Sequence, residues 1–300
     1  MNNELIEKID KACNFLKAME PKEGFYLAFS GGKDSCVCKD LLIRAGCKFD
    51  AHYRVTSVDP PELVRFIKEF HTDVEREVPR YDNGMPITMW NLIPKKMMPP
   101  TRIARYCCEK LKESGGDGRM CVTGVRWEES YTRKNNNGLV NVHSKVLARK
   151  LEENEDFRTE KHGGVVLIND NDDSRRLIES CYTRHKTTVN PIIFWTEKEV
   201  WEYIREFNIP YCKLYDEGFH RLGCIGCPMA RRNGREKEFA RWPKYKAAYL
   251  RAFEEMLKVR EAKGKIDGSW RPGTTPEDIY HWWMEDGVMP GQISIFEDME

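Results

Sequence analysis

The sequence predicts an α/β protein: a doubly wound, mainly parallel sheet with helices on both faces, followed by a C-terminal helical appendage. Short apolar runs that suit buried strands alternate with stretches of helical periodicity, which is typical of parallel sheets. The 300 residues, 40% of them hydrophobic, are enough for a substantial core. We expect a nucleotide-binding main domain over residues 1–230, with a mobile insertion near 131–164, and a helical extension over 231–300.

The elements justify this fold class in chain order. Residues 1–20 carry charge throughout and predict an amphipathic helix rather than a signal peptide. Apolar runs predict strands, and these lie at 24–30, 49–58, 120–125 and 164–169. Apolar residues at helical spacing predict further helices, at 34–46, 60–70, 196–207 and, as a long charged stretch, 235–263. Thr196 and Glu199 form a capping-box pattern at the start of one of them.

Residues 135–164 interrupt this rhythm. They are polar, charged and without strong periodicity, so we interpret them as a mobile lid or, equally well, as a solvated surface loop.

Charge and cysteine content restrict the setting. The 49 basic and 48 acidic residues nearly cancel, so an anion or nucleic-acid site must arise from local clustering. No segment is long and apolar enough to span a bilayer, and we expect a cytoplasmic protein with no membrane partner. Its eleven cysteines are then better explained as thiols or metal ligands than as disulfides.

The turn SGGKDS at 30–35 is the clearest functional signal. A glycine turn between a strand and a helix presents backbone amides and the positive end of the helix dipole to an anion. Lys33 adds a cation, and Ser30 and Ser35 add hydroxyl groups, all of which suit phosphate oxygens. The G-x-x-x-x-G-K-[ST] pattern is absent, and an ordinary connecting turn is the alternative for Gly31, Gly32 and Lys33 alone.

The whole hexapeptide resembles the pyrophosphate-binding loop of the PP-loop ATP pyrophosphatase superfamily. Further segments are similar to its phosphoadenosine phosphosulfate reductase-like branch, in order TSVDPPE (56–62), VTGVRWEES (122–130), NPIIFWTEKEVWEYI (190–204) and YDEGFHRLGCIGCP (215–228). The resemblance implies that ATP phosphates and Mg²⁺ are bound by Ser30, Gly31, Gly32, Lys33, Asp34 and Ser35. It also implies that Asp59 contacts the nucleotide, and that Lys33, Asp34 and Arg126 act in catalysis.

Four cysteines form a candidate metal centre. Cys107 and Cys108 are adjacent, and Cys224 and Cys227 form a C-x-x-C pair. Such a set is compatible with a tetrahedral zinc site, an iron–sulfur cluster or simply buried thiols, and spacing alone does not choose. The arrangement resembles that of assimilatory adenylyl-sulfate reductases, which implies a 4Fe-4S cluster, with zinc as the alternative.

The sequence departs from those reductases in two ways. They use a cysteine near the C-terminus as nucleophile, whereas no cysteine follows Cys227 here, and they usually degrade the loop that this chain keeps whole. We therefore expect an AMP- and pyrophosphate-forming, adenylating enzyme in sulfur transfer. The alternatives are an adenylyl-sulfate or phosphoadenylyl-sulfate reductase that uses an external thiol, and a non-catalytic ATP-binding subunit of a modification or defence system.

The expected partners follow from that hypothesis. Residues 231–246 hold seven basic side chains with Phe239, Trp242 and Tyr245 between them, which suits an acceptor such as tRNA or DNA. A charged helix whose aromatic residues pack inward explains the same pattern. A cysteine desulfurase or similar protein would donate the sulfur, and the oligomeric state is not predicted.

Overall fold

The structure is a computed structural model that describes residues 2–142, 154–159, 164–169, 171, 187–265, 270 and 272–285. Contacts divide the chain into two compact units. The first consists of residues 1–54, 61–77 and 115–222, and the second of residues 55–60, 78–114 and 223–300. The glycine turn therefore belongs to the first unit, and the four candidate metal-binding cysteines to the second.

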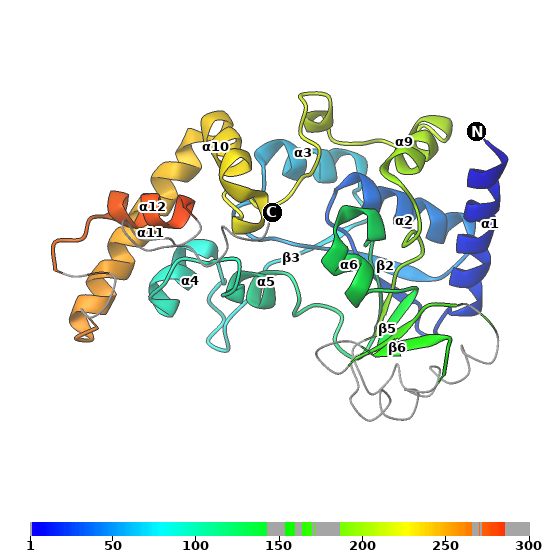
Figure 1. The fold of residues 1–300 in the computed structure, drawn as a ribbon, viewed down its shortest axis with the longest axis horizontal. Helices are drawn as coiled ribbons and strands as arrows, with labels where there is room; N and C mark the ends of the chain where they lie inside the picture. The colour runs from blue at the N-terminus through cyan, green and yellow to red at the C-terminus, as the bar shows by residue number, and fades with distance from the viewer. Residues whose placement is uncertain are drawn as a thin grey trace. The chain divides into compact units, whose positions relative to one another are not determined.

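The first unit contains a single sheet (Figure 1). Its eight described strands lie in the order β3-β2-β1-β4-β8-β5-β7-β6. Their bounds are β1 Phe25–Ala28, β2 Phe49–Arg54, β3 Glu75–Glu77, β4 Met120–Val122, β5 Val140–Val142, β6 Phe157–Thr159, β7 Val165–Leu167 and β8 Thr187–Val189. Neighbouring strands in the run β3-β2-β1-β4-β8 pair in parallel. Every pair that involves β5, β6 or β7 is antiparallel. The expected mainly parallel α/β class is confirmed.

The strand order fixes where a ligand site forms. The chain proceeds from β1 outward to β2 and β3, and then returns to place β4 on the other side of β1. In open α/β sheets, ligands bind at the carboxyl ends of the strands where the order reverses in this way. The segments that follow β1 and β4 contain the SGGKDS turn and Arg126, respectively, and the strand order brings them to this point.

Each unit has its own helices. Those of the first unit are α1 Asn3–Ala18, α2 Lys33–Arg44, α3 Pro61–Phe70, α6 Tyr131–Asn136 and α9 Glu197–Glu206, with the short helices η1 Trp127–Glu129 and η2 Lys213–Tyr215. Those of the second unit are α4 Met89–Lys96, α5 Tyr106–Leu111, α10 Arg231–Arg241, α11 Pro243–Ala262 and α12 Pro276–Met284, with η3 Pro228–Ala230. The capping box of Thr196 and Glu199 at α9 is confirmed.

Two expectations need correction. The segment 135–164 is not simply a lid or a surface loop, because its residues Val140 and Val142 are buried in β5, paired with β7 and β8. Residues 143–153 and 160–163 of that segment lie outside the described part. The long helical stretch after 235 is two helices, since Pro243 cannot continue α10: it lacks a backbone N–H, and it excludes Trp242 from helical geometry (φ −126°, ψ 68°).

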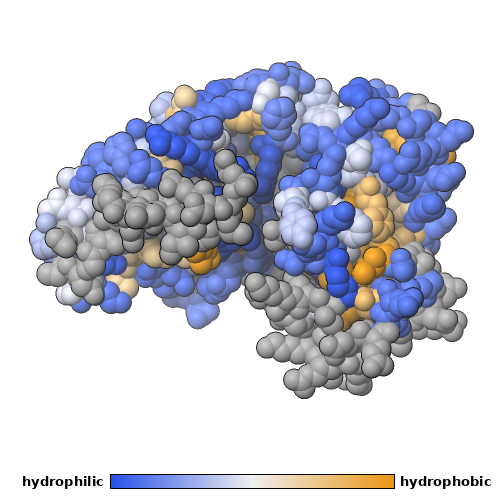
Figure 2. Space-filling model, in the orientation of Figure 1, coloured by the Kyte–Doolittle hydropathy of each residue, from blue (hydrophilic) through white to orange (hydrophobic). Residues whose placement is uncertain are grey.

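The surface in view is mostly hydrophilic, with hydrophobic residues gathered in a few patches (Figure 2). None of the helices in the described residues is long and apolar enough to cross a membrane.

Candidate nucleotide site and cysteine cluster

The SGGKDS turn connects β1 to α2, and glycine is required at its second position. Gly31 has φ +73°, and a Cβ there would lie 2.7 Å from the side chain of Ile67 in α3. Gly32 follows as the N-cap of α2 and provides no side-chain cap. The turn therefore brings bare backbone to the positive end of the α2 dipole, which is the arrangement that binds anions.

The two serines of the turn hold its shape. The Oγ atoms of Ser30 and Ser35 are 3.2 Å apart, and the Ser35 hydroxyl donates to the carbonyl of Gly32 at 2.8 Å. The Ser30 Oγ accepts the N–H of Gly32 at 3.3 Å. Both hydroxyl groups thus bond within the turn and fix the backbone whose amides would face a phosphate.

Lys33 is the first residue of α2, and the residue is only 4% exposed. Its Nζ atom lies 3.4 Å from Asp34, 3.9 Å from Glu197 and 3.4 Å from the carbonyl oxygen of His220. These acceptors hold the ammonium group beside the turn. A cation so placed faces the site where the helix N-terminus and the turn favour negative charge.

Tyr215 of η2 was not predicted as a site residue. Its hydroxyl oxygen accepts the backbone N–H of Lys33 at 3.0 Å, and the Lys33 ammonium lies 5.4 Å from the centre of its ring. Burial raises the pKa of Tyr215, so the hydroxyl stays neutral. The two residues are 182 positions apart in the sequence, and local patterns give no signal for such a contact.

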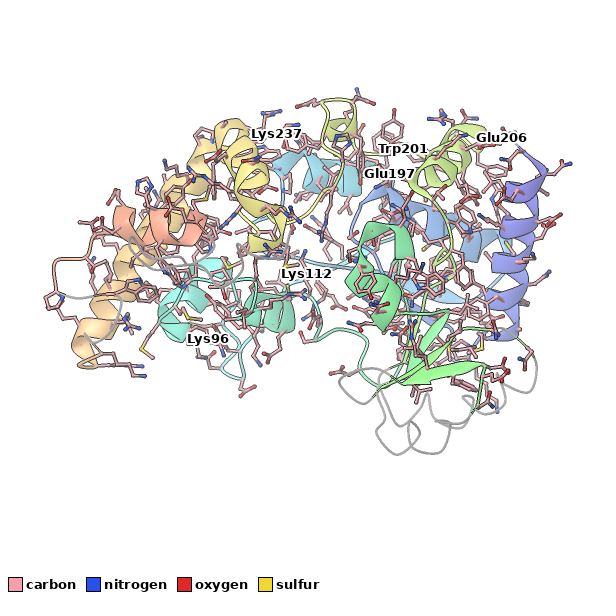
Figure 3. The ribbon with its side chains drawn as sticks, viewed as in Figure 1. Lys96, Lys112, Glu197, Trp201, Glu206 and Lys237 are labelled. Carbon is pink, nitrogen blue, oxygen red and sulfur yellow. The ribbon has the colours of Figure 1, made fainter. Side chains whose placement is uncertain are left out.

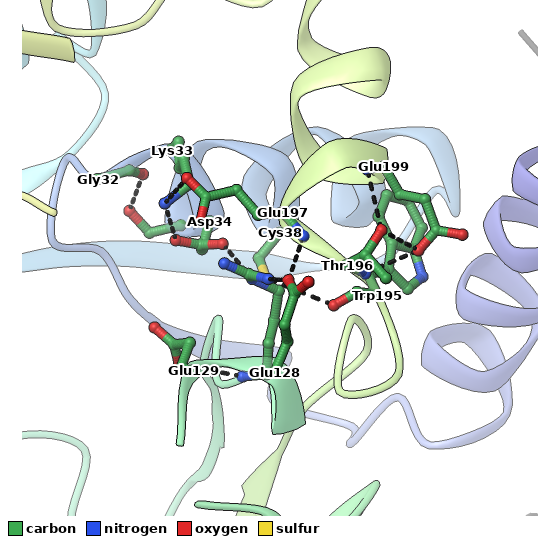
Figure 4. Close-up of polar contacts among 12 residues, drawn as sticks. Gly32, Lys33, Asp34, Cys38, Glu128, Glu129, Trp195, Thr196, Glu197 and Glu199 are labelled. Carbon is green, nitrogen blue, oxygen red and sulfur yellow. Dashed lines mark hydrogen bonds and ion pairs between the residues drawn. The ribbon is translucent and has the colours of Figure 1, made fainter. Parts of the chain in front are cut away.

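Arg126 follows β4 and pairs with Asp34 of the turn. Asp34 is labelled in Figure 4, next to Lys33. The Nε of Arg126 donates to Asp34 at 2.6 Å, and its Nη1 donates to Glu128 at 2.8 Å and to the carbonyl of Trp195 at 3.4 Å. Although burial alone would lower the pKa of Arg126, the charge of Asp34 raises it, so the guanidinium stays charged. The hydrogen bonds of Arg126 to the described residues come from Nε and Nη1, and the residue is only 2% exposed.

Gly124 makes this pairing possible. A Cβ at that position would lie 2.9 Å from the Cβ of Asp34, so only glycine lets the segment after β4 approach the start of α2 so closely. The structure thus brings Ser30, Gly31, Gly32, Lys33, Asp34, Ser35 and Arg126 together. Asp34, which was expected to bind Mg²⁺, forms an ion pair with Arg126. If the Asp34 carboxylate binds a metal ion, it does so while paired with the guanidinium.

Asp59 lies in the second unit, with the cysteines. It is buried, and its carboxylate accepts the backbone N–H of Thr56 at 3.2 Å. Its negative charge acts on Cys224 and on Lys112. The role of Asp59 in binding a nucleotide stays a prediction, and the contacts described here connect it with the cysteines.

The C-x-x-C segment is held rigidly in the second unit. Ile225 between the cysteines is fully buried, and its backbone bonds to Val58 at 2.7 Å and to the Tyr249 hydroxyl at 2.9 Å. Gly226 has φ +75°, and a Cβ there would lie 2.7 Å from the ring of Phe239. The turn can therefore be made only with glycine at this position, and it leaves Cys224 and Cys227 partly exposed.

The four cysteine side chains influence one another electrostatically. A hydrogen bond to Cys108, burial and the charges of the other three cysteines raise the pKa of Cys107. The pKa of Cys108 is lowered, first by the hydrogen bond from the Cys107 thiol and then by Arg105. Burial raises the pKa of Cys224 to about 11. When the Cys224 thiol is ionised, its charge raises the pKa of Lys112, which is labelled in Figure 3.

These observations test whether the cysteines fit a metal centre. All four are partly exposed free thiols with cations nearby, which is the donor chemistry of zinc or iron–sulfur sites. Among the residues that the structure describes, however, no three His, Cys, Asp or Glu side chains converge closely enough to hold a metal ion. The chemistry of the four thiols thus fits a zinc ion or an iron–sulfur cluster. Their side chains would have to move closer together to bind either one.

The basic segment 231–246 packs its aromatic rings inward. Phe239 and Trp242 are buried, and the Tyr245 hydroxyl donates to the carbonyl of Asp59 at 3.0 Å. Arg235 is fully buried and donates to the carbonyls of Trp283 and Met284 at the end of α12, at 2.7 and 3.0 Å. The buried rings of Phe239 and Trp242 cannot stack on bases, which favours the packing explanation of this pattern.

Comparison with known proteins identifies the family. Residues 24–230 match the phosphoadenosine phosphosulfate reductase domain. An uncharacterized protein of Methanocaldococcus jannaschii is 26% identical over 270 residues, which cover 83% of this chain and 46% of that protein. The adenosine 5'-phosphosulfate reductase of Bacillus anthracis is 28% identical over 141 residues, 45% of each chain. The chain thus spans about half the length of these relatives.

Solved structures give weaker similarities. The phosphoadenylyl-sulfate reductase of Candida auris in a phosphate complex is 14% identical, with a TM-score of 0.40 over 75% of this chain and 96% of that one. The FMN adenylyltransferase of Candida glabrata is also 14% identical, with a TM-score of 0.39 over 75% and 66% of the two chains. The sequence match over residues 24–230 covers most of this chain, and the chain therefore belongs to the phosphoadenosine phosphosulfate reductase domain family.

Proposed function

We propose that this protein is an ATP-dependent adenylating enzyme of sulfur transfer, which forms AMP and pyrophosphate. The observation that carries the proposal is the intact SGGKDS turn at the start of α2, with Lys33 and the charged Arg126 on the same site. Backbone amides, an ammonium and a guanidinium together suit a polyphosphate, which has more negative charge than a single sulfate or phosphate ester.

The chain's own residues supply binding and charge stabilisation. The amides of the turn and Lys33 would hold the β- and γ-phosphates, while an oxygen of the acceptor attacks the α-phosphorus. The bond from that phosphorus to the β-bridging oxygen breaks, and pyrophosphate leaves with the bonding electrons. Nη2 of Arg126 would donate to the oxygens that gain charge in this step, and Asp34 and Glu128 hold the guanidinium in place.

The second half of the reaction exchanges AMP for sulfur. A persulfide on a donor protein would attack the activated carbon of the acceptor, and AMP would leave with the oxygen of the former acceptor hydroxyl or carbonyl. A second thiol would then cleave the S–S bond, which leaves the sulfur on the acceptor and a disulfide between that thiol and the donor. Cys107, Cys108, Cys224 and Cys227 would hold a 4Fe-4S cluster, with one thiolate for each iron, and the cluster would supply electron-transfer chemistry or order the second unit. Arg105 favours the thiolate form of Cys108, which a metal ligand needs.

The proposal is tested in two separate measurements on anaerobically purified protein. Iron, acid-labile sulfide and zinc are determined per chain for the wild type and for Cys224→Ala, with Cys13→Ala as a matched control outside the four cysteines. We expect iron with matching sulfide in the wild type and the control, and its loss in Cys224→Ala. Stoichiometric zinc would contradict the cluster and leave adenylation to be judged by the second measurement.

The second measurement follows exchange of labelled pyrophosphate into ATP, in the presence of tRNA or DNA as acceptor. We expect exchange in the wild type and none in Lys33→Ala. Tight ATP binding without exchange, with acceptor and sulfur donor present, would contradict an adenylating enzyme and favour a non-catalytic ATP-binding subunit.

Reduction of adenylyl sulfate by an external thiol is the second candidate. It is favoured by a stretch of 54 residues that is 41% identical to the adenosine 5'-phosphosulfate reductase of Staphylococcus epidermidis, covering 18% of this chain and 22% of that one. In that reaction a thiol attacks the sulfate sulfur and AMP leaves, and a second thiol then displaces sulfite from the thiosulfonate as a disulfide forms. Formation of AMP and sulfite from adenylyl sulfate and thiol, without pyrophosphate exchange, would select it.

A further inference from the structure

The segments next to Arg126 and Trp195 expose aromatic side chains on the surface of the first unit. Tyr131, the first residue of α6, is 81% exposed, Phe194 is 43% exposed, and Trp127 is half-buried. None of these three rings was predicted as part of a site. Exposed apolar side chains that gather in one patch, rather than singly, mark interaction surfaces.

The three rings and one lysine form a row, which we call the aromatic row: Phe194, Trp127, Lys134 and Tyr131. The ring centres of Trp127 and Phe194 are 4.7 Å apart, edge to face at 88°. The Lys134 ammonium lies 5.9 Å from the centre of the Trp127 ring. Tyr131 and Lys134 are three residues apart in α6, which is labelled in Figure 1, so they share one side of that helix.

Hydrogen bonds behind the aromatic row hold it in place. The Nε1 of Trp127 donates to the carbonyl of Asn137 at 2.7 Å, and its backbone N–H donates to the carbonyl of Ile193 at 2.9 Å. The Nη2 of Arg158 donates to the carbonyls of Lys134 and Asn137 at 2.8 and 3.4 Å. Side chains and backbone that are fixed beforehand lose less conformational entropy when a ligand binds.

The charge around the aromatic row suits a polyanion. Basic side chains gather there, namely those of Arg133, Lys134 and Arg158, and the positive charge of Arg221 acts on Arg133. The two carboxylates of the same segment are engaged by arginines, because Glu128 pairs with Arg126 at 2.8 Å and Glu129 pairs with Arg133.

The aromatic row also lies beside the anion site. Trp127 directly follows Arg126 in the chain, and Phe194 directly precedes Trp195. The carbonyl of Trp195, which is labelled in Figure 4, accepts the Nη1 of Arg126 at 3.4 Å. A long ligand bound along the aromatic row therefore passes next to the guanidinium that pairs with Asp34 of the SGGKDS turn.

We propose that the aromatic row binds unpaired bases of a single-stranded nucleic acid, with the phosphates of the strand on Lys134 and the neighbouring guanidinium groups. Bases of any sequence stack on aromatic side chains, and basic side chains contact the phosphates. Lysine is depleted in protein–protein interfaces, whereas here Lys134 lies next to the ring of Trp127. The inference gives the acceptor a binding surface, and it rests on the proposed function only in that this acceptor is a nucleic acid.

The test measures fluorescence anisotropy of labelled single-stranded RNA and DNA oligonucleotides, and of a DNA duplex, without ATP and at a series of salt concentrations. The variants are Tyr131→Leu, Tyr131→Phe as the conservative replacement, and Lys134→Gln. Phe70→Leu and Lys68→Gln are the matched controls, since they replace an exposed ring and an exposed lysine of α3.

We expect Tyr131→Leu to weaken binding of the single strands by roughly 5- to 150-fold, the range for loss of one stacked base, with the salt dependence unchanged. Tyr131→Phe should keep most of the affinity. Lys134→Gln should lower the slope of log affinity against log salt concentration by about 0.7, the value for one phosphate contact to a single strand. The duplex should lose no affinity in Tyr131→Leu, because its bases are already stacked on one another.

Equal affinities of the wild type and Tyr131→Leu for the single strands would overturn the inference and leave the aromatic row to a protein partner. Equal weakening of the single strands in Phe70→Leu, or of the duplex in Tyr131→Leu, would overturn it as well, because neither loss is specific to a base on the aromatic row. Circular dichroism checks that each variant is folded.

Exchange of labelled pyrophosphate into ATP separates this inference from the proposed function. A wild type that binds single strands through Tyr131 but exchanges no pyrophosphate would contradict the adenylating enzyme and leave the aromatic row standing. Exchange that depends on a nucleic acid, with binding of that nucleic acid unchanged in Tyr131→Leu, would overturn the aromatic row and leave the adenylating enzyme standing.

Discussion

The Tyr215 hydroxyl and the backbone N–H of Lys33 lie 3.0 Å apart, so the first amide of α2 is bonded to a neutral oxygen. This amide is one of those that a helix N-terminus offers to an anion. A phosphate oxygen at the turn must therefore either bond alongside the hydroxyl or replace it.

The first prediction concerns that competition. Tyr215→Phe keeps the ring and frees the amide, so we expect tripolyphosphate to bind about 2- to 10-fold more tightly, the value of one net hydrogen bond. Calorimetry measures the change, and Tyr211→Phe, which removes a hydroxyl that bonds to Asp216 instead, is the matched control. Weaker binding in Tyr215→Phe would show that the hydroxyl assists the phosphate.

The second prediction concerns the pair of Arg126 and Asp34. Arg126→Lys keeps the charge but cannot bond to Asp34, Glu128 and the phosphate at once, so we expect kcat/KM for AMP formation to fall about 100- to 1,000-fold. Arg44→Lys disrupts a comparable pair with Asp40 at 2.5 Å on the surface of α2 and should change the rate little. Similar losses in both variants would remove the special role of Arg126.

The third prediction concerns the C-x-x-C turn. Gly226→Ala forces a side chain into a left-handed position against Phe239, Tyr249 and Trp283, so we expect the free energy of unfolding to fall by about 2–5 kcal/mol, from overpacking and backbone strain together.

Gly264→Ala isolates the contribution of the backbone. Gly264 has φ +64°, and no atom lies within 4 Å of a Cβ there. Its variant should lose only about 1–2 kcal/mol, the strain of the left-handed conformation. Urea denaturation measures both variants, and equal losses would contradict the packing argument.

The fourth prediction concerns stability against pH. His71 is buried between Phe29 and Phe66, with its Nδ1 3.3 Å from the ammonium of Lys39. Burial, and then the Lys39 charge, lower the pKa of His71 from 6.5 to about 4. Between these values the unfolded chain takes up a proton that the folded chain does not, so stability is lost as pH falls from about 6.5 to about 4.

The loss should amount to a few kcal/mol, since one pKa unit corresponds to about 1.4 kcal/mol. His71→Gln should flatten the dependence over this window, although it lowers stability at neutral pH, and the exposed His281→Gln should not. Denaturation midpoints at a series of pH values provide the measurement. An unchanged slope in His71→Gln would assign the acid sensitivity to other groups.

The sequence by itself determined the local features. The strand at 24–30, the turn at 30–35 and the capping box of Thr196 and Glu199 depend on neighbouring residues, and the structure has all three. The family follows from the same motifs, because their order along residues 24–230 is a property of the sequence. Pro243 is a local signal of the same kind, since a proline ends a preceding helix, and it divides the single helix expected over 235–263 into α10 and α11.

Only the tertiary structure decided which distant residues meet. The sheet order places Arg126 against Asp34, and the loop after α9 brings Tyr215 to Lys33, contacts that span 92 and 182 positions. The polar composition of residues 135–164 predicted a lid or a surface loop, and this prediction was wrong for part of the segment. Pairing with β7 and β8 buries Val140 and Val142. The fold likewise assigns Cys107, Cys108, Cys224, Cys227 and Asp59 to one unit, although they come from three separate segments of the sequence. Burial and pairing depend on the whole fold, whereas turns and caps depend on a few adjacent residues.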